Sequence, residues 1–219
     1  MLLLMSPAPA QDVVQAGSAW YAAGEAALAA KMAEQPNTGR ARNVILFIAD
    51  GMGVGTNYAI RLFEGQQKGK LGEEHILHHE GFPYTALVKT YNINAQTPDS
   101  AATAGAINSG VKQVFGTINA GEDAIRGDCA SQAGEKLTLF SELAASAGKS
   151  VGVVSTARIT HATGAAVYAR VAERNWEAAA PEGCTDIATQ LVDMIDAGVI
   201  DLALGGGARN FVPAGAETP

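Results

Sequence analysis

The sequence predicts an α/β fold with a mostly parallel central sheet flanked by helices. Segments with the composition of β-strands alternate along the chain with segments whose apolar residues recur at helical spacing. Of the 219 residues, 47% are hydrophobic and 17% are charged, so the chain has enough apolar surface to build a core. The 25 glycines follow no period, which favours tight turns over a fibrous repeat.

Residues 17–91 contain two predicted helices and two predicted strands. Residues 17–35 show an Ala-rich amphipathic pattern, ended by the turn-forming sequence QPNTG. Residues 44–49 form a continuous apolar run that leads into Asp50 and a Gly-rich turn, which is typical of a strand buried on both faces. A helix over 56–63 follows, and residues 84–91 are rich in strand formers.

The rest of the chain continues the alternation. An Ala-rich helix is predicted over 101–110, and a second helix begins near Leu137 and ends at the capping residue Gly148. A strand over 150–156 and a helical face from Ile187 to Ile195 come next. A strand over 199–207 then runs into three glycines. The order strand, helix, strand predicts a parallel arrangement.

Charge and hydropathy exclude two classes of protein. The net charge is −7 and lysines and arginines form no cluster, which argues against binding to nucleic acid phosphates. The longest apolar runs, 1–5 and 44–49, are far shorter than the roughly 20 residues that span a bilayer. We therefore expect no transmembrane segment in this chain.

The N-terminus and the cysteines bear on localisation. Residues 1–10 (MLLLMSPAPA) end in a small-x-small pattern but lack a basic region, so they read as a remnant of a signal peptide or as a simple N-terminal extension. Cys129 and Cys184 are the only cysteines and lie in polar, turn-like settings. In an exported protein this even count favours one disulfide, whereas in a reducing cytosol both would be inert thiols.

Two candidate chemical groups follow predicted strands. Ligands of parallel sheets bind at the carboxyl ends of strands, where Asp50 and residues 160–163 are placed. A carboxylate after a buried strand is paired, metal-bound or the cap of the next helix. The neighbouring GMGVG lacks the last glycine of a dinucleotide fingerprint, because Thr56 stands in its place.

Three further polar groups could act on phosphate. Ser100 stands at the start of a predicted helix, where amide groups stabilise an anion, although an ordinary N-cap serine has the same position. His161 and Thr163 could both reach one metal ion, or simply lie in a surface loop. Arg174 could hold two phosphate oxygens with its planar fork, or be a surface charge. The HILHH sequence at 75–79 lacks further ligands for zinc.

Five stretches together carry a family resemblance. They are NVILFIADGMGVG, PYTALVKTYN, TPDSAATAGA, GKSVGVVSTARITHATGAAVYARVAERNW and EGCTDIATQL with the later LGGG. In this order they resemble the alkaline phosphatase family, and most closely its animal-type members with histidine. The resemblance implies an alkaline phosphatase-like fold, with a helical arm over 11–38 and the N-terminal part of a catalytic domain over 39–219.

The resemblance also implies catalytic roles. Ser100 resembles the nucleophile that becomes phosphorylated, and Arg174 resembles the arginine that binds phosphate oxygens. Asp99 resembles the acidic neighbour that orients this arginine. The implied activity is hydrolysis of phosphate monoesters through a phosphoserine intermediate.

The implied cofactors are two Zn²⁺ ions and one Mg²⁺ ion. Asp50 resembles the carboxylate that bridges zinc and magnesium, and the Ser100 oxygen is a ligand of the same zinc. Thr163 resembles a magnesium ligand, and His161 stands where the family has Asp or a histidine that reaches magnesium through water. The family's remaining ligands follow in a later part of the chain, so we expect the isolated 219 residues to be incomplete and inactive.

Several expectations about context follow from the same resemblance. They are a Cys129–Cys184 disulfide, export to the periplasm or the extracellular space, and a homodimer embraced by the N-terminal arm. Two other activities remain open: a sulfatase or phosphodiesterase of the same superfamily, and a non-catalytic phosphate-binding fragment. A sulfatase is disfavoured because Ser100 is followed by Ala-Ala-Thr-Ala and not by x-P-x-R.

Overall fold

The computed structural model describes residues 14–35, 37–134 and 136–213. The chain divides into two compact units. The first contains the residues up to Leu46 together with Gly55–Leu87, and the second contains Phe47–Val54 together with the residues from Val88 on. The possible signal remnant at 1–10 lies outside the described residues.

The first unit is built from helices. Its elements are the 3-10 turn η1 (Val14–Gly17), helix α1 (Ala19–Ala33), helix α2 (Val54–Gln67, whose first residue belongs to the second unit) and the 3-10 turn η2 (His78–Gly81). The predictions of helices over 17–35 and 56–63 are therefore confirmed. None of the residues of α1 is buried. Turn η2 is tied to α2 by an ion pair between Arg61 and Glu80.

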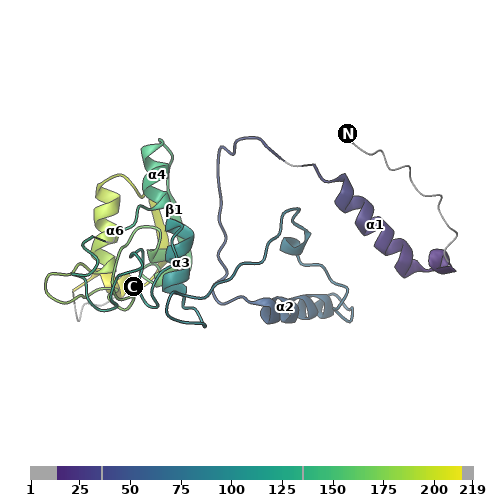
Figure 1. Ribbon diagram of the computed structural model, residues 1–219, viewed down its shortest axis with the longest axis horizontal. Coiled ribbons are helices and arrows are strands. Elements are labelled where there is room, and N and C mark those ends of the chain that lie inside the picture. Colours follow the sequence, from purple (N-terminus) through teal and green to yellow (C-terminus); the bar gives the residue numbers. More distant parts are fainter. Residues whose placement is uncertain (1–13, 36, 135, 214–219) are drawn as a thin grey trace. The chain divides into compact units, whose positions relative to one another are not determined.

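The second unit holds the sheet. Its elements are α3 (Ser100–Ser109), α4 (Phe140–Ser146), β1 (Gly152–Arg158), α5 (Ala162–Ala165), α6 (Ile187–Asp196), β2 (Leu202–Gly206) and η3 (Ala208–Phe211). Strands β1 and β2 pair in parallel, with Gly152 opposite Leu202. Helices α3, α4 and α6 gather around the strands within this unit (Figure 1).

The core of the second unit consists mainly of alanines and branched aliphatic side chains from α3, β1, α5, α6 and the loops next to them. Tyr168 is its largest fully buried residue, and its hydroxyl donates to the carbonyl of Ile159 at 2.8 Å. Burial raises the pKa of the Tyr168 hydroxyl, so the tyrosine stays neutral. Asn119 adopts a positive φ of 52° and donates from Nδ2 to the carbonyls of Ala166 and Ala169, at 2.7 Å each.

Two of the predicted strands are wrong, and the central sheet is smaller than predicted. Residues 44–49 and 84–91 are assigned to no strand in the described part of the chain, where the sheet has two strands. Phe47 and Leu87 are 90% and 95% exposed. An apolar run indicates that a segment seeks burial, but a strand forms only where a neighbouring strand supplies hydrogen bonds. The predicted strands at 150–156 and 199–207 do pair, as β1 and β2.

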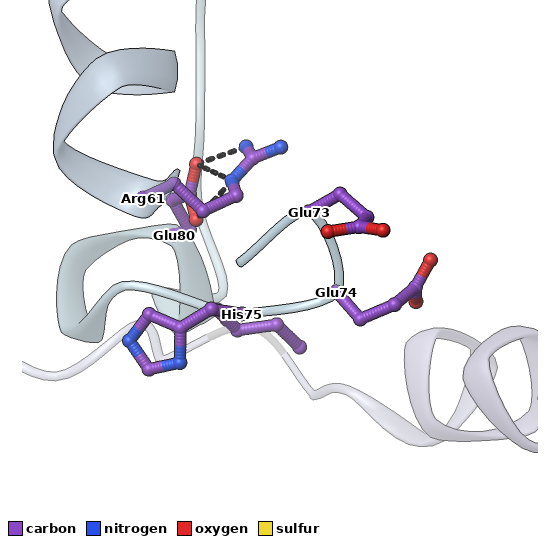
Figure 2. Close-up of a pocket in the computed structure, with 6 residues that line it drawn as sticks. Arg61, Glu73, Glu74, His75 and Glu80 are labelled. Atoms are coloured by element: carbon purple, nitrogen blue, oxygen red, sulfur yellow. Dashed lines mark hydrogen bonds and ion pairs between the residues drawn. The ribbon is translucent and has the colours of Figure 1, made fainter. Parts of the chain in front are cut away.

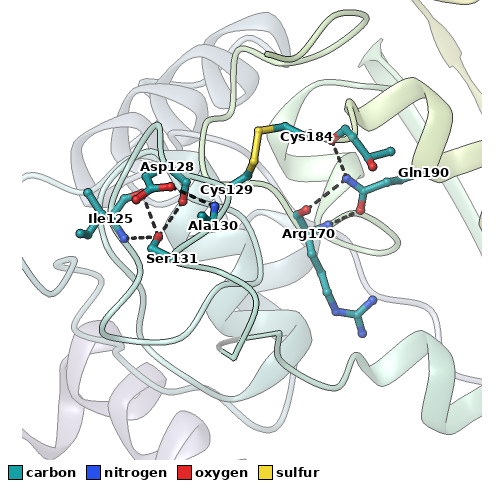
Figure 3. The surroundings of a disulfide bond; sticks show 9 residues. Ile125, Asp128, Cys129, Ala130, Ser131, Arg170, Cys184 and Gln190 are labelled. Atoms are coloured by element: carbon teal, nitrogen blue, oxygen red, sulfur yellow. Dashed lines mark hydrogen bonds between the residues drawn. A yellow bond between two sulfur atoms is a disulfide. The ribbon is translucent and has the colours of Figure 1, made fainter. Parts of the chain in front are cut away.

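Cys129 and Cys184 form a disulfide, as expected, with 5.8 Å between their Cα atoms. The bond joins the loop that holds Ile125, Asp128 and Ser131 to the segment that precedes α6 (Figure 3). In this loop the Ser131 hydroxyl donates to the carbonyl of Asp128 at 2.6 Å. No helix within the described ranges is long and apolar enough to cross a membrane.

Candidate active site

The N-terminus of α3 presents the first two candidate residues. Asp99 is the N-cap of α3, and its Oδ1 accepts from the backbone N–H of Ala102 at 3.2 Å. Ser100 is the first residue of the helix. The helix begins here because Asp99 satisfies one of its free amide groups. Ser100 is half-buried and lies where the free amides of α3 favour negative charge.

Arg174 connects α3 to the loop that follows β1. Its Nη1 donates to Oδ2 of Asp99 at 3.0 Å, and its Nη2 lies 3.2 Å from Nε2 of His161. Its backbone N–H donates to the carbonyl of Gly116 at 2.9 Å. The side chain of Arg174 is 22% exposed and that of Asp99 is 7% exposed, so the pair is partly shielded from water. The guanidinium is thus held at two nitrogens beside the start of α3.

The loop after β1 supplies His161 and Thr163. His161 is the N-cap of the short helix α5, which places Thr163 in its first turn. The Thr163 hydroxyl donates to Oδ2 of Asp50 at 2.9 Å, although the two residues are 113 positions apart in the sequence. Asp50 lies in a turn with Gly51, whose φ of 77° suits glycine. The candidate residues from three distant stretches therefore meet in the second unit.

His161 has a lowered pKa. Burial lowers the pKa of the imidazole first, and the positive charge of Arg174 lowers it further, while the Asp50 carboxylate acts in the opposite direction. Since a guanidinium can only donate, the Nε2 atom that faces Arg174 is in the accepting state. His161 is therefore neutral in neutral solution and keeps a lone pair.

The oxygen atoms of Asp50 and Thr163 fit two ligands of a magnesium ion. Neighbouring ligands of octahedral Mg²⁺ are about 2.9 Å apart, because each lies 2.0–2.1 Å from the ion. The separation of these two oxygens is 2.9 Å, and both are hard donors. Over the described ranges, no group of three or more His, Cys, Asp and Glu residues is arranged to hold a metal ion. Asp50 and Thr163 thus fit two of the ligands of a magnesium ion and not a complete set.

The histidines of HILHH do not converge on one point. His75 Nε2 lies 3.2 Å from Oε1 of Glu64, His79 Nε2 lies 2.9 Å from Oδ1 of Asn57, and the His78 ring meets Phe82 edge-on. His75 also lines a pocket of about 340 Å³ in the first unit.

In that pocket the His75 ring points away from the two glutamates that follow α2, while Arg61 and Glu80 pair with each other (Figure 2). The described geometry therefore gives no support for zinc binding by the histidines of HILHH.

A second polar cluster, which the sequence analysis did not identify, lies next to His161. The Glu177 carboxylate accepts from Arg158 Nε at 2.8 Å, from the Thr160 hydroxyl at 2.6 Å and from Asn210 Nδ2 at 3.0 Å. We call these four residues the Glu177 cluster. No local motif marks it, because its members come from β1, the loops on either side of α5 and η3.

Most of the chain fits one family. A family model described as alkaline phosphatase matches residues 41–219. The chain belongs to the alkaline phosphatase family. The candidate residues of the site all lie inside this matched region.

Several curated relatives of this chain are vertebrate alkaline phosphatases. The chain is 45% identical over 184 residues to the tissue-nonspecific alkaline phosphatase isozyme of Gallus gallus, with 81% of this chain covered. It is 43% identical over the same length to an alkaline phosphatase of Gadus morhua. The chain spans little more than a third of these relatives, 35% and 38% of their lengths.

Solved structures of the family share the fold. A cold-active alkaline phosphatase from the psychrophile Shewanella sp. matches with a TM-score of 0.58 and 28% identity, over 76% of this chain and 36% of that one. The Thermus thermophilus alkaline phosphatase matches with a TM-score of 0.56 and 28% identity, over 76% and 30%. The α/β class is thereby supported, with the described chain holding part of the fold.

Proposed function

We propose that this chain carries the phosphate-binding and nucleophile-bearing part of a phosphomonoesterase. The observation that carries the proposal is the Arg174 guanidinium, held between Asp99 and His161 immediately beside Ser100. A guanidinium fixed in this way is ready to donate to two oxygens of a phosphoryl group. Family membership supports the same activity.

Ser100 is the proposed nucleophile. Its Oγ loses a proton to water and attacks phosphorus, the bond from phosphorus to the ester oxygen breaks, and that oxygen takes a proton from water and leaves as the alcohol. Water then attacks the phosphoserine and releases inorganic phosphate. The free amides at the start of α3 stabilise negative charge at Ser100 during both steps. Arg174 orients the phosphoryl group and offsets its charge, while Asp99 fixes the guanidinium.

The proposed cofactors are two Zn²⁺ ions and one Mg²⁺ ion. Asp50 and Ser100 would hold one zinc, Asp50 and Thr163 would hold magnesium, and His161 would reach magnesium through water. When bound, these ions supply positive charge that favours deprotonated hydroxyl groups at neutral pH. Zinc takes about four ligands, whereas only two, Asp50 and Ser100, are proposed here for the first zinc. We therefore expect the 219 residues alone to show little phosphatase activity.

The activity is tested on the full-length product of the gene with three substrates: p-nitrophenyl phosphate, its bis-ester and its sulfate. We expect the monoester to be hydrolysed fastest. Ser100→Ala should reduce turnover by at least about a thousandfold, because the covalent route is lost. Arg174→Ala should weaken inhibition by inorganic phosphate about tenfold. Ser146→Ala, which alters an exposed hydroxyl at the end of α4, is the matched control.

Three results would contradict this proposal. Full activity of the Ser100→Ala variant would exclude the phosphoserine route. Faster hydrolysis of the bis-ester or the sulfate would favour the phosphodiesterase or sulfatase alternative. Phosphate binding without any turnover by the full-length product would favour a binding protein.

We further propose that the protein is exported. The Cys129–Cys184 disulfide supports this, since such bonds persist in oxidising compartments. Recovery of both cysteines as free thiols from the native source, by alkylation without reductant, would contradict export.

A homodimer is also proposed, with the helical arm over 11–38 at the interface. Helix α1 supports this, because Trp20, Leu28 and Met32 are 61–76% exposed and the helix buries none of its residues in the described chain. Deletion of residues 1–35 should weaken dimerisation of the full-length protein in light scattering at low concentration. An unchanged dimer would exclude this role.

A further inference from the structure

The Glu177 carboxylate joins three separate segments of the second unit. Its Oε1 accepts from Nε and Nη2 of Arg158, the last residue of β1, at 3.1 and 2.6 Å. Its Oε2 accepts from the Thr160 hydroxyl at 2.6 Å and from Asn210 Nδ2, in η3, at 3.0 Å. Asn210 Nδ2 also donates to Oγ1 of Thr160 at 2.7 Å. Both carboxylate oxygens are thus fully used.

The backbone around Glu177 is fixed as well. The N–H of Ile187 donates to the carbonyl of Trp176 at 2.8 Å, and the N–H of Ala188 donates to the carbonyl of Glu177 at 2.9 Å. These bonds join the loop to the first turn of α6. Thr160, at the other side of the cluster, is fully buried. Glu177 therefore links two rigid parts of the unit, the end of β1 and the start of α6.

Candidate residues of the phosphate site lie on both of the segments that Glu177 joins. His161 directly follows Thr160, and Arg174 lies three residues before Glu177. These two residues meet across the gap, with 3.2 Å between Nη2 of Arg174 and Nε2 of His161. Within the described residues, Glu177 makes no hydrogen bond or ion pair with the Arg174 guanidinium, so it can act on Arg174 only through the backbone segment that carries both residues.

We propose that Glu177 is a positioning residue of the phosphate site, which holds the Arg174 segment at a fixed distance from the loop of His161 and Thr163. The proposal rests on the proposed function of Arg174. Neutralising the carboxylate removes the acceptor for the Arg158 charge and places an amide donor against the Thr160 hydroxyl or Asn210. The guanidinium of Arg174 then loses its fixed orientation toward phosphate.

A second arginine–carboxylate pair in the same unit provides a matched control. Glu142, in α4, accepts from Nη2 of Arg170, and both side chains of this pair are partly buried, as are those of Arg158 and Glu177. Neither α4 nor Arg170 is a candidate part of the phosphate site. Glu142→Gln removes one ion pair of the same type, so a general loss of stability should be common to it and to Glu177→Gln.

The first measurement does not depend on activity. Arginine guanidinium signals of the ¹⁵N-labelled 22.5 kDa chain are recorded by NMR, and those of Arg174 are assigned with Arg174→Lys. In the unmodified chain the Nη groups of Arg174 should be distinct, because each has its own acceptor. We expect Glu177→Gln to merge or shift these signals and Glu142→Gln to leave them in place.

The second measurement is the affinity of the full-length protein for inorganic phosphate, in the presence of zinc and magnesium. Glu177→Gln should weaken binding about tenfold when Arg174 is present and less than about twofold in an Arg174→Ala background. Glu142→Gln should change it less than about twofold in either background. This dependence on Arg174 separates positioning from a general structural effect.

The outcomes decide the proposal as follows. Unchanged Arg174 signals in Glu177→Gln overturn it, and so do equal shifts in Glu142→Gln. Equal loss of phosphate affinity with and without Arg174 also overturns it. If the unmodified protein binds no phosphate, the proposed function fails while the Arg174 signals still test Glu177. Should Glu177→Gln not fold, Asn210→Ala, which removes one donor of the cluster, is judged by the same signals.

Discussion

The disulfide provides a prediction whose size follows from chain length. Cys129 and Cys184 are 55 positions apart. Replacing both by serine removes this closed loop from the unfolded ensemble and increases its entropy. In the chain-entropy description, a loop of this length corresponds to about 4 kcal/mol of stability at 25 °C. For a unit of this size such a loss lowers Tm by about 8–16 °C.

The assay is urea and thermal unfolding followed by circular dichroism, with and without a phosphine reductant. The reduced unmodified chain is the matched control, because it keeps both sulfur atoms and loses only the cross-link. We expect it to unfold like the Cys129→Ser/Cys184→Ser variant. Reductant should leave the double variant unchanged.

The reasoning is refuted if the reduced chain and the double variant are each within about 1 kcal/mol of the oxidised chain. It is also refuted if only the double variant is destabilised, because the effect then comes from the loss of side-chain packing. Pocket-lining residues around the disulfide, which include Trp176 and Tyr168, allow fluorescence to report the same transition.

Two further predictions concern single side chains. Pairing with Arg61 lowers the pKa of Glu80 from 4.5 to about 2, so its stabilising contribution is complete above pH 4.5 and is lost as the pH falls toward 2. Glu80→Gln should therefore be less stable than the unmodified chain at pH 7 in urea unfolding and equally stable near pH 2; a constant difference across this range would refute the pairing. Tyr168→Phe should cost about 1–2 kcal/mol in the same assay, because the buried carbonyl of Ile159 loses its donor, and a change within about 0.3 kcal/mol would show that water replaces the hydroxyl.

Local sequence signals predicted the helices better than the strands. Helix α3 begins at Ser100 because Asp99 caps it, and both the cap and the alanine-rich run are visible in the sequence. The apolar run at 44–49 predicts burial equally clearly, yet Phe47 is exposed. Strand formation depends on a partner that is distant in sequence, and a single segment carries no information about that partner.

The candidate site shows the same division. Individual residues were suggested by their positions after strands or at helix starts, but Asp99 and Arg174 are 75 positions apart and their contact follows only from the fold. The family resemblance is what predicted that these residues belong to one site. Their catalytic roles stay predictions. Nothing in the sequence indicated a role for Glu177, because a glutamate in a polar loop is normally a solvated surface residue.

The two roles of Asp99 limit the substitutions that this position can tolerate during evolution. One of its oxygens accepts from the amide of Ala102 and from Asn92, while the other accepts from Arg174. A substitution at this position must therefore satisfy two requirements, the start of helix α3 and the orientation of the Arg174 guanidinium. Asparagine preserves the first requirement and weakens the second, whereas glutamate keeps the charge and lengthens the cap. We expect natural variation here to be much narrower than at Asp186, which caps α6 without an arginine partner in the described chain.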